Sequence, residues 1–140
     1  EICYCVHFVR EVAGDCVSYP LIGKLRDVGF ECVSIKENKP FSYKLVLNHM
    51  KNKSKLVSAF HVISEKKLIN PTLELDYDIF VCGDDKESVQ VVNSLIDEIK
   101  GLRSLYLGPI ELSYLAEMCT PLLLNAMIRN KIKNPGIKII

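Results

Sequence analysis

Apolar residues along the chain form two patterns, short continuous runs and stripes at helical spacing. The runs are typical of buried strands and cover residues 2–9, 31–35, 55–63, 77–82 and 104–107. The stripes predict helices over residues 18–28, 41–50, 111–130 and the stretch between Asp84 and Gly101. Strands therefore alternate with helices, which predicts an α/β fold with a mostly parallel sheet and helices on both faces.

Two of the predicted helices have distinctive patterns. In the first, Asp84 and Glu87 form a capping box and Gly101 ends the helix. Its core stripe comprises Val89, Val92, Leu95, Ile96 and Ile99. The final helix, 111–130, is long and apolar on two faces, so it must be buried on more than one side. It either sinks into its own core or, as we favour, forms a homodimer interface or a cofactor pocket.

Composition and charge narrow the class of protein. The chain has 140 residues, of which 49% are hydrophobic and 25% charged, with a net charge of +1. This balance gives no electrostatic reason to expect nucleic acid or a membrane as partner. We expect a cytoplasmic protein, because no basic leader with a long apolar core follows Glu1. A start at Glu1 rather than Met indicates a trimmed or incomplete N-terminus.

Six cysteines in a chain of this length raise the question of disulfides or a metal site. Cys32, Cys82 and Cys119 lie in apolar runs, where a free thiol behaves as a small hydrophobe, so we predict free thiols in a reducing compartment. The alternative is a metal site of Cys3, Cys5 and His7, which would share one face of a strand. It lacks an evident fourth ligand, and no metal is predicted.

From Lys55 onward the chain carries several motifs in one order. They are Ala59-Phe60-His61 after an apolar run, Val81–Asp85 (VCGDD), Leu107–Ile110 (LGPI), Glu117–Leu122 (EMCTPL) and Gly136–Lys138 (GIK). In order and spacing these segments resemble the second half of the NADPH-dependent reductases of the deazaflavin coenzyme F420. The resemblance predicts a single α/β domain over residues 1–140. Its first part, 1–54, would be a degenerate Rossmann-like part, and 55–140 would be an F420-reductase-like part.

The resemblance implies small-molecule cofactors and the residues that contact them. Hydride would pass between coenzyme F420 and NADP(H), and the protein would stack and orient the two groups. His61 would line the deazaflavin site, with backbone groups of Val62 and Ile63 at the polar edge of the ring and the tail residues Gly136 and Ile137 on the same side. No catalytic side chain is predicted. The alternative for His61 is a core histidine with its hydrogen bonds satisfied.

The first part departs from the family pattern. A dinucleotide fold needs G-x-G-x-x-G, whereas residues 13–18 (AGDCVS) hold one glycine, Gly14, and Asp15 opposes a phosphate. Lys36 and Lys39 follow the second predicted strand, where an NADP enzyme often keeps a basic residue for the 2′-phosphate. NADP is therefore the doubtful cofactor. The alternative is that Gly14 forms a plain turn and that Lys36 and Lys39 lie in a solvated loop.

Three functions stay open on the sequence alone. The first is an oxidoreductase that uses F420 and NADP(H). The second is a non-catalytic relative that keeps the fold as a dimerising or ligand-binding module after loss of the phosphate loop. The third is an NAD(P)-binding protein with another substrate.

Overall fold

The computed structural model describes the backbone of residues 3–6 and 30–33, and residues 55–63, 67–68, 72, 74–133 and 135–140 in full. The predicted helices 18–28 and 41–50 lie outside these residues. So do Gly14, Lys36 and Lys39, which stay predictions.

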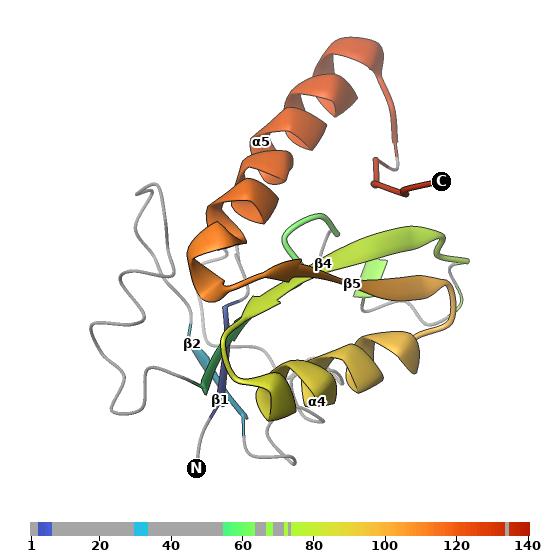
Figure 1. Ribbon diagram of the computed structural model, residues 1–140. Helices are drawn as coiled ribbons and strands as arrows, with labels where there is room; N and C mark the ends of the chain where they lie inside the picture. Colours follow the sequence, from blue (N-terminus) through green and yellow to red (C-terminus); the bar gives the residue numbers. More distant parts are fainter. Residues whose placement is uncertain are drawn as a thin grey trace.

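Five strands form one sheet in the order β2-β1-β3-β4-β5 (Figure 1). They are β1 (Cys3–Val6), β2 (Phe30–Val33), β3 (Leu56–Ser58), β4 (Tyr77–Gly83) and β5 (Leu102–Gly108). β1 pairs in parallel with β2 and β3, and β4 pairs in parallel with β5. β3 and β4 run antiparallel, so the sheet is mixed. The predicted α/β class is confirmed.

The described residues include two α-helices, one on each side of the sheet (Figure 1). α4 (Lys86–Asp97) lies against β4 and β5, and α5 (Ser113–Asn130) follows the short 3-10 helix η2 (Ile110–Leu112) over the other face. No helix in the described part of the chain is both long and apolar enough to cross a bilayer.

The cap of α4 differs from the prediction by one residue. Asp85, not Asp84, caps the helix, because its carboxylate accepts from the backbone N–H of Ser88 at 2.9 Å. The Ser88 hydroxyl also donates to Asp85, at 2.5 Å, so Ser88 takes the place predicted for Glu87. Asp84 instead accepts from the backbone N–H of Ile110 at 3.2 Å. It thereby ties the end of β4 to the start of η2.

The hydrophobic core lies between α4 and the sheet and continues under α5. The predicted α4 stripe is confirmed, since Val89, Val92, Leu95 and Ile96 are buried and Ile99 packs against them. β3 and β4 supply the facing residues, with Val57, Ile79 and Val81 fully buried. Apolar burial of this kind is the main favourable term in folding.

β3 is shorter than the predicted strand over 55–63. The strand ends at Ser58, and Phe60 takes a left-handed backbone conformation with φ 68°. Residues 59–63 are nevertheless buried throughout. The apolar run therefore marks a short strand followed by a buried turn, and this turn carries His61.

Candidate functional site

The candidate site lies at the end of the sheet where β3 ends and the antiparallel β4 begins. β1, β2 and β3 are parallel, so their carboxyl ends share this edge. β4 is antiparallel to β3 with Ser58 opposite Cys82, which places the Tyr77 end of β4 beyond the end of β3. Open α/β sheets bind ligands outside the carboxyl ends of their parallel strands. The turn of residues 59–63, here called the His61 turn, leaves the sheet there.

Two hydroxyl groups hold His61. The Ser58 hydroxyl lies 2.6 Å from the imidazole Nε2, and the Thr120 hydroxyl of α5 donates to the backbone carbonyl of His61 at 2.6 Å. The residue is 6% exposed. His61 is thus buried, with its imidazole Nε2 bonded by Ser58 and its backbone carbonyl bonded from α5.

Phe60, directly before His61, is under backbone strain. A left-handed φ is uncommon for a bulky residue and costs on the order of 1–3 kcal/mol. Phe60 is 2% exposed and belongs to the hydrophobic core cluster. Such strain persists only where the surroundings over-determine the conformation, and it concentrates at functional sites.

The C-terminal tail, residues 135–140, docks beside the start of β4. Ile137 accepts at its carbonyl from the backbone N–H of Asp78 at 2.8 Å, and its side chain packs against the core cluster. Gly136 lies on Tyr77, because a Cβ built there would be 1.7 Å from ring atom Cε1. The buried Lys67 ammonium donates to the Tyr77 hydroxyl at 2.7 Å and to the Pro135 carbonyl at 3.1 Å.

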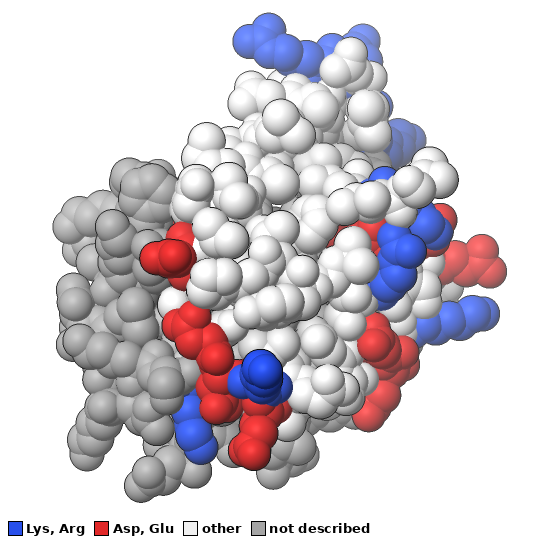
Figure 2. All heavy atoms as spheres, viewed as in Figure 1, with Lys and Arg blue, Asp and Glu red and all other residues white. Residues whose placement is uncertain are grey.

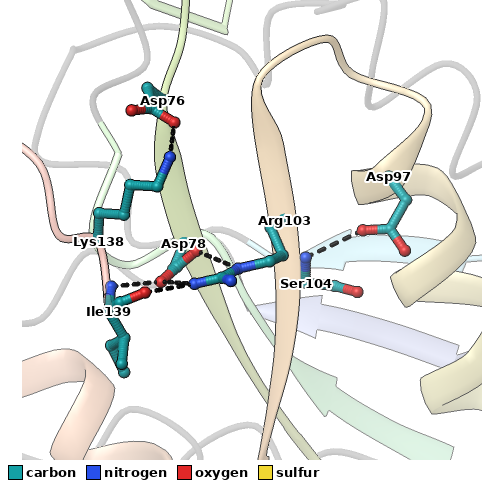
Figure 3. Close-up of polar contacts among 7 residues, drawn as sticks. All are labelled: Asp76, Asp78, Asp97, Arg103, Ser104, Lys138 and Ile139. Carbon is teal, nitrogen blue, oxygen red and sulfur yellow. Dashed lines mark hydrogen bonds and ion pairs between the residues drawn. The ribbon is translucent and has the colours of Figure 1, made fainter.

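Charged side chains hold the last residues of the tail (Figure 3). Arg103 of β5 donates to both carboxylate oxygens of Asp78, at 2.8 and 2.7 Å. Ile139 donates its N–H to Asp78 at 2.6 Å, and its carbonyl accepts from Arg103 at 2.7 Å. The hydrogen bonds from Arg103 hold the pKa of the Asp78 carboxyl below its usual value, against the opposing effect of burial. Lys138 forms a further ion pair with Asp76.

The structure therefore brings most of the predicted deazaflavin residues to one place. Val62 and Ile63 are members of the core cluster against which Ile137 packs. Gly136 contacts Tyr77 at the adjoining end of β4. Whether any of these residues contacts a cofactor stays a prediction.

The sequence motifs contact one another. The EMCTPL helix reaches the His61 turn through Thr120, and the VCGDD junction reaches the LGPI turn through Asp84 and Ile110. Tyr106 of β5 adds a hydrogen bond from its hydroxyl to the Gly83 carbonyl at 3.1 Å. The GIK tail reaches β4 through Asp78. The sequence did not predict four of these residues as site residues: Ser58, Thr120, Asp78 and Arg103. Thr120 nevertheless belongs to the EMCTPL motif.

Two cysteines have described side chains, and both are free thiols. Cys82 is a buried free thiol whose pKa burial raises to about 11, and Cys119 is also free. No group of three side chains able to hold a metal ion occurs among the residues described in full. The side chains of Cys3, Cys5 and His7 lie outside them.

Sequence comparison with known proteins supports the resemblance to F420-dependent NADP reductases. No protein-family model matches the chain. The F420-dependent NADP reductase of Methanocaldococcus jannaschii is 40% identical over 95 residues, which is 68% of this chain and 42% of that protein. The chain is homologous to F420-dependent NADP reductases. Those of Methanothermobacter thermautotrophicus and Methanothermobacter marburgensis are 34% and 33% identical over 86 residues, or 61% of this chain.

The chain spans about two fifths of the length of these F420-dependent NADP reductases, 37–42%. A crystal structure of a candidate F420-dependent NADP reductase from Arthrobacter sp. FB24 superimposes with a TM-score of 0.61 and 18% identity. The match covers 78% of this chain and 57% of that one. At this identity the likeness shows a shared fold.

Proposed function

We propose that this chain takes part in hydride transfer between coenzyme F420 and NADP(H). The observation that carries the proposal is its homology to F420-dependent NADP reductases, with the His61 turn in contact with the EMCTPL helix and the GIK tail in contact with the start of β4. When bound, the two cofactors supply the chemistry, a direct hydride transfer between the deazaflavin carbon and the nicotinamide. The protein contributes binding and orientation.

Val62 and Ile63 are 4% and 6% exposed, so in this proposal they would offer backbone groups, rather than side-chain surface, to the polar edge of the ring. Ile137 packs against the core cluster that contains them, and Phe60 holds a left-handed backbone conformation directly before His61. We propose that His61, Val62, Ile63, Gly136 and Ile137 form the F420 side of the site. Because the His61 turn is buried, its part is to shape the wall and exclude water rather than to exchange a proton with solvent.

NADP is the weaker half of the proposal. Two phosphates need close backbone N–H donors or compensating cations. The segment around Gly14 has one glycine and an adjacent acid, Asp15. Lys36 and Lys39 are the proposed contacts for a 2′-phosphate.

Calorimetric titration with each cofactor tests the proposal. We expect F420 to bind, and His61→Ala to weaken that binding about tenfold, the loss of roughly one hydrogen bond to a buried partner. His49→Ala is the matched control, since His49 belongs to none of the motifs. NADPH should bind weakly, with an affinity that falls as salt is raised.

Other outcomes have distinct meanings. Tight NADPH binding without a response to F420 would contradict the assignment of His61 and the tail to the deazaflavin. No binding of either cofactor would contradict the oxidoreductase and favour a non-catalytic, dimerising relative.

We also propose a homodimer through the 111–130 helix. Met118, Leu122 and Ile128 of α5 are 61%, 64% and 71% exposed. Figure 2 shows an uncharged surface in the region of α5, with basic groups toward its far end. A second copy of the chain would cover this surface, as expected for a long apolar helix at a subunit interface.

Light scattering at micromolar concentration tests the dimer. Met118→Glu and Ile128→Glu should yield monomers, because each places a charge in the interface. Val91→Glu is the matched control, an apolar residue 37% exposed on α4. A monomeric wild-type protein would contradict the proposal.

The remaining proposals concern organisation and location. We propose a single Rossmann-like domain, residues 1–140, in which 1–54 is the degenerate dinucleotide part and 55–140 the F420-reductase-like part. A cytoplasmic location fits the free thiols of Cys82 and Cys119.

A further inference from the structure

Thr120 uses its side chain differently from three other residues of α5. Cys119, Asn125 and Asn130 each donate to the backbone carbonyl four residues earlier in the same helix, at 3.4, 3.0 and 3.0 Å. A helical threonine commonly does the same. The Thr120 hydroxyl instead donates to the His61 carbonyl, 59 positions away in sequence, at 2.6 Å.

This turn of α5 is the one that faces the His61 turn. Cys119 and Leu123, on either side of Thr120, pack against the core cluster that contains Val62 and Ile63. Pro121 follows inside the helix and removes one internal hydrogen bond, because it has no N–H. The packing thus directs the Thr120 hydroxyl at the His61 turn, next to the point where α5 lacks the hydrogen bond of Pro121.

The His61 turn needs external support. Phe60 holds a left-handed φ of 68°, which a bulky residue keeps only when its neighbours determine it. The segment is anchored on one side by Ser58, bonded to the imidazole of His61, and on the other by Thr120, bonded to its carbonyl. A buried carbonyl that loses a donor is costly, so the conformation of this turn depends on Thr120.

We propose that Thr120 is a positioning residue for the F420 site. It holds the His61 turn from α5, so that one hydroxyl, 59 positions away in sequence, helps to set the direction of the His61 backbone and, through it, of the ring. This inference rests on the proposed function, because the ligand of the His61 turn is taken to be F420. Thr120 itself need not touch that ligand.

The test compares Thr120→Val, which removes the hydroxyl at constant shape, with Thr120→Ser, which keeps it. Asn125→Ala is the matched control, since it removes a hydrogen bond that stays within α5. Three quantities are measured for each protein: the dissociation constant for F420, the NMR nitrogen shifts of the His61 imidazole without ligand, and the thermal unfolding midpoint. Thr120→Ala serves as a second hydroxyl-free variant if Thr120→Val fails to fold.

Thr120→Val should weaken F420 binding about tenfold, because the His61 turn must then hold its binding conformation without one buried hydrogen bond. It should also shift the His61 ring signals, because the ring and the carbonyl belong to the same residue. Thr120→Ser should restore both quantities, and Asn125→Ala should change neither.

Two results would overturn the positioning role. One is unmoved His61 ring signals in the hydroxyl-free variants; the other is a Thr120→Ser protein that behaves like Thr120→Val. If the wild-type protein binds no F420, the proposed function fails, and the ring signals still decide whether Thr120 positions the His61 turn.

Discussion

The C-terminal tail and the His61 turn lie at the same end of the sheet, yet different chemistry holds them. Ion pairs fix the tail: Asp78, with its side chain 1% exposed, bonds Arg103, which is 53% exposed. Neutral hydroxyl groups fix the His61 turn, through Ser58 and Thr120. The tail lies at the surface, where ions and water compete, whereas the turn is buried.

This difference predicts different responses to solution conditions. Interactions of a carboxylate weaken when it is protonated, and exposed ion pairs weaken with salt. The hydrogen bond from the Thr120 hydroxyl to the His61 carbonyl joins two uncharged groups, so salt does not screen it. Salt should therefore loosen the tail before the His61 turn, and three substitutions in the tail region measure how strongly the tail is held.

Asp78→Asn should have the largest effect. The carboxylate accepts two hydrogen bonds from Arg103 and one from the Ile139 N–H, and it is buried. We expect a loss of about 2–3 kcal/mol in the free energy of unfolding, typical of hydrogen bonds to a charged group. Urea unfolding measures it, with Asp76→Asn as the exposed control. Equal losses in the two variants would contradict the special role of Asp78.

The same variant tests the pH dependence. The folded-state pKa of Asp78 lies below its usual value of 3.8, chiefly because of the hydrogen bonds from Arg103. Its contribution is therefore present above pH about 4 and lost as pH falls through the folded pKa. Asp78→Asn should flatten this acid limb of the stability curve, whereas Thr120→Val should lower stability without changing the shape of the limb.

Gly136→Ala should have an intermediate effect, about 1–2 kcal/mol, typical of an overpacked site that relaxes in part. The added Cβ would overlap the Tyr77 ring, at 1.7 Å from Cε1, so the tail or the ring must shift. In a Tyr77→Ala background the same substitution should cost little. A full cost there would place the obstruction elsewhere.

Lys138→Met should have the smallest effect. Its ion pair with Asp76 joins side chains that are 46% and 74% exposed. Such pairs contribute about 0–1 kcal/mol, and salt screens them. Thermal unfolding of wild type and variant should differ slightly at low salt and coincide at high salt. A difference that persists at high salt would indicate lost packing of the lysine stem.

The apolar pattern predicted the fold class because each element buries a continuous run or stripe. It could not place two boundaries. Asp84 and Asp85 both precede the apolar stripe of α4, and either carboxylate could cap the helix. Only the folded structure shows that Asp85 is the cap and that Asp84 accepts from Ile110, at the start of η2. The apolar run 55–63 hides the end of β3, because a buried turn and a buried strand have the same composition.

The motifs of the resemblance gave His61, Val62, Ile63, Gly136 and Ile137 as neighbours of one cofactor, and this assignment stays a prediction. In the structure Val62 and Ile63 belong to the core cluster against which Ile137 packs, and Gly136 lies on Tyr77. The sequence did not give the residues that support the turn and the tail, because Thr120 and His61 are 59 positions apart and Asp78 and Ile139 are 61 apart. No local periodicity carries information over such separations.

The pair of Asp78 and Arg103 has a consequence for assembly. The two residues stand opposite each other in the pairing of β4 with β5. If β5 slipped by one residue, Arg103 would point to the other face of the sheet and leave the buried carboxylate without its partner. Ile139 finds both of its binding groups, Asp78 and Arg103, only on a correctly aligned pair of strands. Docking of the tail is therefore coupled to the register of β4 and β5.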